Sequence, residues 1–279
     1  MDPRTCTLSP ALCLSLALLL SACASAPPDD YRPRLSQQLE ETLTPADIQA
    51  EVDFGRHVAA SILGRMDGLD NDAVQRYVNL VGQTVARASR RPELDFYFYV
   101  LESDQVNAYA APGGYVFITR PALALMRDES ELAAVLAHEI AHVDQRHIVR
   151  ALDIGATGSD AGLAQLMGGA SETTRVVFDQ AVDQALSILF EKGLERQDEL
   201  EADAQGAILL ASTGYDPGAL RRYLDRVHES GTDQHAELSG THPPFDVRLA
   251  ALDRQLHDEG LTGLDYPRLA ERFRDRTQP

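Results

Sequence analysis

The sequence has few basic residues for its length. Its 279 residues include 25 Lys and Arg against 43 Asp and Glu, which gives a formal net charge of -18 at pH 7. A nucleic-acid-binding protein needs a basic face for the phosphates, so this balance argues against nucleic acid as a partner. It also disfavours adhesion to anionic lipid by charge alone. We interpret the excess acidic residues as a solvated surface.

The sequence also lacks a second long apolar run. The first run, from about Leu8 to Leu20, is too short and too early for a membrane-spanning helix. It is typical of the apolar region of a secretory signal. No later window of about 20 residues is apolar enough to cross a membrane. With 44% hydrophobic residues, the chain can still bury the core of one domain or two small ones.

Cysteine is scarce as well, and two of the three cysteines, Cys6 and Cys13, lie inside this signal. The apolar run ends in LSAC at residues 20–23. This ending resembles a bacterial lipobox, in which the cysteine is acylated and the chain is cut just before it. An ordinary signal cleaved near the same place is the alternative. By the same resemblance, Ala24 after the cysteine implies sorting to the outer membrane.

The expected domain organisation follows from these features. Residues 1–22 are the lipoprotein signal peptide, and residues 23–43, rich in proline and polar residues, are a lipidated tether. Residues 44–258 form one domain, and residues 259–279 form a C-terminal tail. Cys23 is then the one cysteine of the mature chain, so an internal disulfide is excluded. Any metal site has to use histidines and carboxylates.

The domain is predicted to be mainly helical with a small sheet. Thr44, Pro45 and Asp47 form a helix start with an N-cap, a proline in the first turn and an acid near the N-terminus. The remaining predicted elements are a helix over 71–88, a strand within 94–103, a turn and strand within 107–119, and helices from about 121 to 256. This order predicts an α+β fold.

The most informative stretch is AAVLAHEIAHVDQRH, residues 133–147. Asp128 and Glu131 predict a capping box at the start of this helix, which is expected to continue to about Leu152. Two histidines and a glutamate in the middle of so apolar a helix call for a chemical reason.

The spacing of these residues supplies the reason. His138 and His142 are about 40° apart around a helix and one turn apart along it. Both imidazoles therefore project from the same face, as two ligands of one ion require. Glu139 lies beside them, about 60° from His142, where it can hold a water without binding the metal. This is the zincin motif H-E-x-x-H, in which the metal acidifies water and the glutamate takes its proton. His147 is expected on another face, in a structural or supporting role.

The third ligand is expected from a later helix. The long metzincin form of the motif would have a glycine at position 145 and a histidine at position 148. This chain has Gln145 and Ile148 there, so that class is excluded. In the stretch LERQDELEADAQGAILLA, Glu199 and Asp203 share the inward face. We therefore expect Glu199 to bind the metal and Asp203 to orient a ligand histidine. Glu201 is about 200° from Glu199 and is expected to point outward.

Four motifs in order, NAYAAPGG, AHEIAHVDQRH, ELEADAQG and THPPFDVRLA, resemble those of metallopeptidase family forty-eight. That family includes the CAAX prenyl proteases, HtpX, the mitochondrial Oma-type proteases and the periplasmic proteases BepA and LoiP. The resemblance implies a gluzincin endopeptidase fold with an active-site helix, a small edge-stranded sheet and a second ligand-bearing helix. It also implies one Zn²⁺ per chain, His138, His142 and Glu199 as ligands, and Glu139 as general base.

The chain also departs from parts of the family. It has no membrane helix after the signal, unlike the prenyl proteases and HtpX, and no helical-repeat domain like that of BepA. The closest type is therefore a periplasmic lipoprotein protease of the BepA and LoiP kind, with LoiP the nearer of the two.

For several other positions the sequence leaves two roles open. By resemblance, His242 stands near the zinc, either as a donor to the transition state or as an occluding fourth ligand. Tyr115, Val116 and Phe117 belong either to an edge strand that pairs with a substrate or to an ordinary buried strand. Arg248 is either a cleft residue or part of a salt bridge. The glycine-rich start of 153–192 suggests a lid or plug.

Three classes of function remain at this point. The first is a zinc endopeptidase on the periplasmic face of the outer membrane that degrades misfolded or stalled envelope proteins, with the envelope assembly machinery as an expected partner. The second is a chaperone-like lipoprotein that binds clients and seldom cuts them. The third, a structural metalloprotein, is disfavoured by Glu139, because a closed structural site needs no adjacent base.

Overall fold

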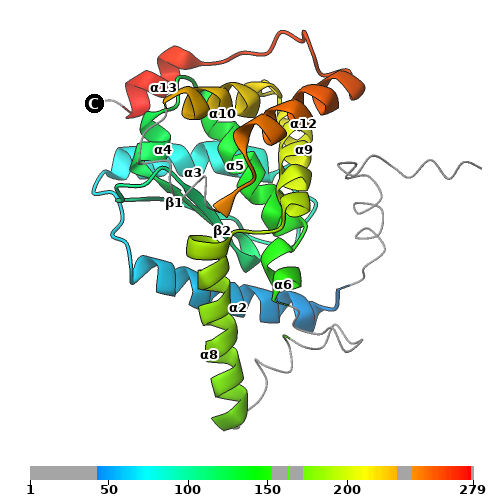
Figure 1. Ribbon diagram of the computed structural model, residues 1–279. Helices are drawn as coiled ribbons and strands as arrows, with labels where there is room; N and C mark the ends of the chain where they lie inside the picture. Colours follow the sequence, from blue (N-terminus) through cyan, green and yellow to red (C-terminus); the bar gives the residue numbers. More distant parts are fainter. Residues whose placement is uncertain (1–42, 153–162, 164–171, 231–240, 278–279) are drawn as a thin grey trace, which may run out of the picture.

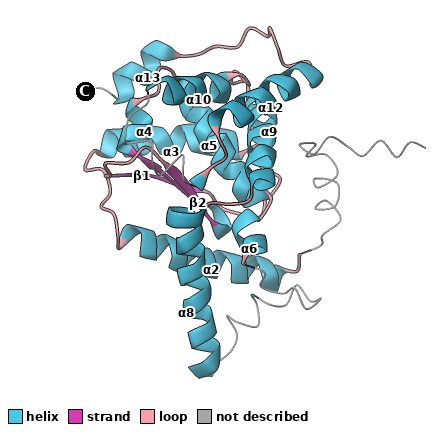
Figure 2. Cartoon of the chain, in the orientation of Figure 1, coloured by secondary structure: helices cyan, strands magenta, loops and turns pink. Residues whose placement is uncertain are grey.

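The computed structural model describes residues 43–152, 163, 172–230 and 241–277, so the signal, the tether and Cys23 lie outside the described residues. So does most of the glycine-rich start of 153–192. The strands are β1 (Tyr97–Leu101), β2 (Ala108–Ala111) and β3 (Tyr115–Thr119). The helices are α2 (Pro45–Leu63), α3 (Asp72–Ala86), α4 (Arg120–Ala124), α5 (Glu129–Asp144), α6 (His147–Ala151), α8 (Glu172–Ser187), α9 (Arg196–Thr213), α10 (Ala219–Ser230), α12 (Phe245–Asp258) and α13 (Ala270–Thr277). Figure 2 shows that helices dominate, which confirms the predicted mainly helical α+β class.

The first described helix begins where the sequence predicts. The Thr44 hydroxyl accepts a hydrogen bond from the backbone N–H of Asp47, and the Asp47 carboxylate accepts one from the N–H of Thr44. This reciprocal capping box satisfies two backbone donors that a helix start would otherwise leave unpaired. From there α2 crosses one side of the small sheet (Figure 1).

The sheet has the order β1-β3-β2, with β3 parallel to β1 and antiparallel to β2. The central strand is therefore β3, so of the two alternatives for Tyr115, Val116 and Phe117 the topology agrees with an ordinary strand inside the sheet and contradicts the substrate-binding edge. The reason is the short 3-10 turn before β3, Pro112–Gly114, which folds β2 back alongside it. Gly113 has a φ of 73°, which a side chain rarely adopts, and a Cβ there would meet the backbone of Val52.

Two helices at the centre of the molecule carry most of the predicted site. Residues 129–143 of α5 are all buried, and α9 packs along α5 (Figure 1). The two backbones approach closely at Gly206, where a Cβ would lie 3.2 Å from the backbone nitrogen of His138. A glycine at this point lets α9 present its acidic side chains directly to the histidines of α5.

The predicted helix to Leu152 is interrupted. It ends at Asp144, and Arg146 adopts the left-handed conformation with a φ of 55° before α6 begins at His147. The Arg146 Nε donates to Glu51 Oε2 of α2 at 2.9 Å, a contact that holds the chain in this turn. Because of the turn, His147 folds back behind the active-site helix.

The C-terminal residues pack on the domain. In the segment that the sequence analysis separated as a tail, α13 buries Phe273, whose ring lies 6.4 Å from that of Tyr77 on α3. Arg272 of α13 pairs with Glu129 at the start of α5.

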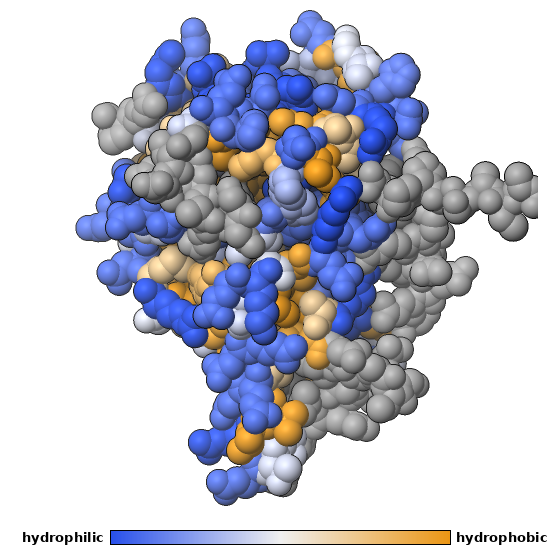
Figure 3. All heavy atoms as spheres, in the orientation of Figure 1, coloured by the Kyte–Doolittle hydropathy of each residue, from blue (hydrophilic) through white to orange (hydrophobic). Residues whose placement is uncertain are grey.

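At the other end of the molecule, α8 projects from the body (Figure 1). Figure 3 shows apolar side chains near its free end, where Val176 and Val177 are 50% and 42% exposed. None of the helices in the described ranges is both long and apolar enough to span a membrane.

Candidate metal centre

His138 and His142 project from the same side of α5, one turn apart. Their Nε2 atoms lie 3.0 Å from each other, and the two rings meet edge to face with centroids 4.6 Å apart. Both residues are buried. The i, i+4 spacing thus brings two imidazole nitrogens to one point, as expected from the sequence.

Glu199 approaches this point from α9. Its Oε2 lies 3.6 Å from His138 Nε2, and its Oε1 lies 3.6 Å from His142 Nε2. Oε2 is buried and makes no hydrogen bond. Ligand atoms about 2.0 Å from a tetrahedral ion lie about 3.3 Å from one another, so the three side chains fit a metal of zinc's size and preference. A buried carboxylate oxygen without a hydrogen bond calls for such a cation.

The other nitrogen of His138 is held by a carboxylate. Asp203 Oδ1 lies 2.9 Å from His138 Nδ1, and Arg248 donates to both oxygens of Asp203, at 2.6 and 2.9 Å. Arg248 therefore forms the salt bridge that was one of its two predicted roles, beside the cleft. Burial lowers the pKa of His138, but the nearby carboxylates of Asp203 and Glu199 outweigh it and raise that pKa to about 9.

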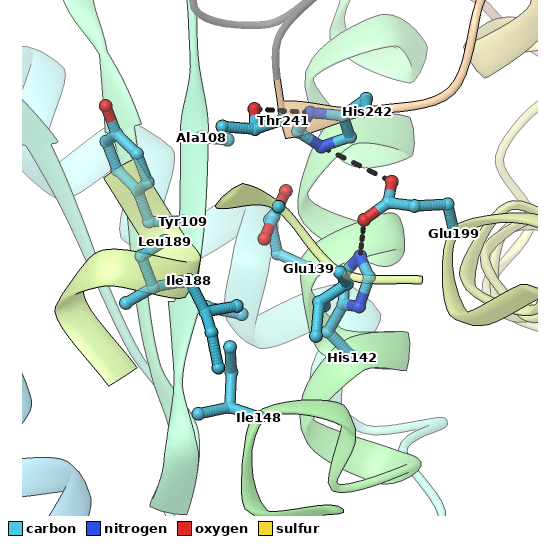
Figure 4. Close-up of a pocket in the computed structure, with 13 residues that line it drawn as sticks. Ala108, Tyr109, Glu139, His142, Ile148, Ile188, Leu189, Glu199, Thr241 and His242 are labelled. Carbon is cyan, nitrogen blue, oxygen red and sulfur yellow. Dashed lines mark hydrogen bonds and ion pairs between the residues drawn. The ribbon is translucent and has the colours of Figure 1, made fainter. Parts of the chain in front are cut away.

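Glu139 faces the pocket on the other side of the histidines (Figure 4). The wall opposite it includes Ala108 and Tyr109 of β2, the strand that forms the sheet edge on this side. Burial raises the pKa of Glu139 to about 7, and the nearby Glu199 charge acts in the same direction. A carboxylate with a pKa near neutrality can take up and release a proton, as a general base must.

His242 closes the same pocket from the segment before α12 (Figure 4). Its Nε2 lies 3.4 Å from Glu199 Oε2, and its Nδ1 lies 3.0 Å from the hydroxyl of Thr241. His138, Glu199 and His242 have ligand atoms within 4.8 Å of one another. Burial lowers the pKa of His242 to about 4, so the imidazole is neutral at pH 7.

The structure corrects the prediction for Glu201. Its side chain does not point outward but is fully buried, and its Oε2 lies 3.5 Å from His147 Nε2. The periodicity does place it away from Glu199, but α6 covers that face of α9. Helical periodicity does not predict this burial, because it depends on the turn at Arg146.

Other pocket residues also escaped the sequence analysis. Ile188 and Leu189 line the pocket from a π-helical turn, Ile188–Lys192, that ends α8. Gly193 follows at a φ of 72°, and a Cβ there would clash with the carbonyl of Thr241. The glycine thus brings the end of the π-helical turn against the residue before His242. An isolated glycine after an apolar helix is the signal that marks this position.

The site as built combines three buried ligand-type groups, a carboxylate base and a neutral histidine around one pocket. Such a set is suited to metal-assisted hydrolysis of a carbonyl compound.

Comparison with known proteins agrees with this chemistry. Residues 72–256 match the model of "Peptidase family M48". The beta-barrel assembly-enhancing protease of Escherichia coli (strain K12) is 27% identical over 241 residues, which is 79% of this chain and 46% of that protein. The chain thus spans about half the length of that relative.

Two further relatives have other names than the beta-barrel assembly-enhancing protease. The mitochondrial metalloendopeptidase OMA1 of Schizosaccharomyces pombe is 28% identical over 64% of this chain and 52% of its own length. A protease HtpX homolog of Burkholderia multivorans is 27% identical over 74% of both chains.

Proposed function

The chain belongs to peptidase family M48, and we propose that it is a metalloendopeptidase that uses one Zn²⁺ to cut proteins in the bacterial cell envelope. One observation carries this proposal: His138, His142 and Glu199 converge on one buried point, with the carboxylate of Glu139 at the adjoining pocket. In this proposal the first three side chains hold the metal, and His242 is a possible fourth ligand.

A zinc ion held there would act as a Lewis acid towards a peptide carbonyl and would lower the pKa of water to about 7. Glu139 would remove a proton from the attacking water and deliver it to the nitrogen of the leaving amine. The neutral imidazole of His242 would donate a hydrogen bond to the oxygen of the tetrahedral intermediate. Asp203 would hold His138 in the tautomer that leaves Nε2 free for the metal.

The substrate is proposed to bind as an extended chain against β2. In the described part of the chain β2 pairs with β3 and lies at the edge of the sheet, which is the position where an extended peptide can add as a further strand. Ala108, Tyr109 and Ala110 of β2 line the pocket that contains Glu139. The proposed substrate edge is therefore β2, and residues 115–117 belong to the strand inside the sheet.

The location is proposed from the sequence and from the names of relatives. Cys23 would carry acyl chains that anchor the protein at the periplasmic face of the outer membrane, because two or more chains hold firmly where one does not. The name of the E. coli relative refers to beta-barrel assembly. Misfolded or stalled periplasmic and outer-membrane proteins are the substrates we propose, in quality control near the envelope assembly machinery.

The test is a Glu139→Gln variant of the full chain. We expect it to keep its zinc, measured by mass spectrometry, and to lose nearly all cleavage of casein, an unfolded protein probe. A Glu229→Gln variant, altered at an exposed site on α10, is the matched control and should cut at the wild-type rate. Full activity of the zinc-loaded Glu139→Gln protein would contradict the mechanism. Casein binding without any product in the wild type would favour the chaperone-like alternative.

A further inference from the structure

A second group of titratable side chains lies buried behind His142, on the side away from Glu199. His147 of α6 turns its Nδ1 towards His142 Nδ1 at 2.7 Å. Its Nε2 lies 3.5 Å from Glu201 Oε2 and 3.7 Å from Asp198 Oδ1, both on α9. All of these residues are buried, and the fold brings them together through the turn at Arg146.

By proximity alone, His147, Asp198 and Glu201 resemble a second metal site. The charge balance argues against one, because a cation is already present. Arg150 Nη2 lies 3.0 Å from Asp198 Oδ1 and 3.9 Å from Glu201 Oε2. A divalent ion between the two carboxylates would be repelled by this guanidinium. The group therefore has to be explained by its contact with His142.

We propose that His147 is a positioning residue that holds His142 in the tautomer and orientation needed to bind the metal. This inference rests on the proposed role of His142 as a ligand. If Nε2 of His142 binds a metal, the ring proton is on Nδ1, and at 2.7 Å it is donated to His147 Nδ1. His147 then carries its own proton on Nε2, which faces the carboxylates of Glu201 and Asp198.

The carboxylates near Nε2 of His147 determine the direction of the hydrogen bond between the two rings. If His147 carried its proton on Nδ1, it would donate to His142, and His142 would then present an N–H to the metal. Two carboxylates accept but do not donate, so they favour the proton on Nε2 of His147. Through His147, the buried carboxylates of Glu201 and Asp198 thereby determine which nitrogen of His142 carries the proton.

The two ligand histidines are thus supported in different ways. His138 contacts the carboxylate of Asp203 directly, and Arg248 neutralises that carboxylate. For His142 an imidazole is inserted between the ligand and its carboxylates, and Arg150 supplies the positive charge. Groups that orient a metal ligand in this way contribute about 10–100-fold to metal affinity.

The experiment compares zinc binding by two variants of the full chain, His147→Leu and His147→Asn. Leucine removes the acceptor for His142 Nδ1–H, whereas the Asn side-chain oxygen can replace His147 Nδ1 as an acceptor. With a chromophoric chelator as competitor, we expect the dissociation constant for Zn²⁺ to rise about 10–100-fold in His147→Leu and only a few-fold in His147→Asn. The visible spectrum of the cobalt-substituted proteins should change in the same order.

Two controls separate positioning from a loss of folding. Urea unfolding of the metal-free proteins reports their stability without the ion, and His57→Leu changes an exposed histidine on α2. Glu201→Gln is a second variant that leaves His147 in place. Because an amide can donate as well as accept, it should also weaken zinc binding.

Equal zinc affinity in wild type, His147→Leu and Glu201→Gln would overturn the inference while leaving the proposed function intact. The same conclusion would follow if His147→Leu and His147→Asn weakened binding equally, in proportion to a loss of metal-free stability. If wild-type protein bound no zinc, the proposed function would fail together with this inference.

Discussion

Arg248 makes two hydrogen bonds with Asp203, of 2.6 and 2.9 Å, at a place where both side chains are almost fully buried. Asp203 in turn contacts His138. One carboxylate therefore links the helix that follows His242 to the first histidine of the motif. Arg248 neutralises the buried charge of Asp203. If the guanidinium were removed, that charge would destabilise the folded protein.

We expect Arg248→Leu to reduce the free energy of unfolding by about 3–5 kcal/mol, because the buried carboxylate of Asp203 would lose both hydrogen bonds with the guanidinium and keep only its contact with the His138 ring. Urea denaturation of the metal-free protein measures this loss. Arg221→Leu is the control, since Arg221 pairs with Asp253 at an exposed site and its removal should cost less than about 1 kcal/mol. Equal losses in the two variants would show that the Asp203 contact is not specially important.

The second prediction concerns the carboxylate ligand. Glu199→Ala should lose zinc, because it removes one of three groups that meet at the metal position. Glu195→Ala, altered at an exposed residue just before α9, should keep it. Metal content after dialysis, measured by mass spectrometry, distinguishes the two. Glu201→Ala is no longer a neutral control, since Glu201 is buried against His147. Retention of zinc by Glu199→Ala would refute the ligand assignment.

How far the sequence predicts this molecule depends on the range of the interactions involved. Helical spacing alone places His138 and His142 on one face, and the same rule places Glu199 and Asp203 together on α9. These are local relationships within one helix. The structure brings both pairs to the same point, as the resemblance to the family implied.

The errors arise from contacts between distant segments. The helix break at Arg146 is held by Glu51, 95 positions earlier in the chain, and helical periodicity has no access to such a contact. The buried environment of Glu201 follows from that break. The central position of β3 likewise depends on how β1 and β2 pair with it, which the strand pattern of 115–119 does not determine.

A third prediction concerns the dependence of stability on pH. Glu129 accepts hydrogen bonds from the hydroxyls of Tyr77 and Tyr215, at 2.7 and 2.8 Å, and pairs with Arg272 of α13. Burial raises the pKa of Glu129, but the hydrogen bonds from Arg272 and the two tyrosines outweigh it, so the pKa is lowered overall. The ionised form is therefore favoured in the folded state.

A lowered pKa means that Glu129 contributes stability above the pH at which it titrates when unfolded, about 4.3. That contribution is lost as the pH falls through the lower pKa of the folded protein. Glu129→Gln should therefore be less stable than wild type at pH 7, by about 1–3 kcal/mol, and the difference should narrow below about pH 4.3. Urea unfolding over a pH series measures this gap. A gap that does not change with pH would contradict the expectation.

The last prediction concerns His242, for which the structure leaves two roles in competition. Its Nε2 lies 3.4 Å from Glu199 Oε2, close enough either to fill the fourth position at the metal or to donate to the substrate oxygen. A plug alone would make His242→Ala cut faster than wild type. A donor would make the same variant bind zinc normally and lose about two to three decades in turnover, equivalent to about 2.7–4 kcal/mol.

We expect a resting enzyme plugged by His242 and a working enzyme that uses the same ring as donor, so the net effect of His242→Ala is a loss of turnover. Thr241→Val should lose less, because it removes the 3.0 Å contact of the Thr241 hydroxyl with His242 Nδ1 but leaves the imidazole itself in place. His257→Ala changes an exposed histidine of α12 and should have no effect. Single-turnover cleavage of a fluorogenic peptide by zinc-loaded proteins separates the outcomes. Faster cleavage by His242→Ala would mean that His242 only occludes the metal. Kinetics identical to wild type would contradict both the occluding role and the donor role.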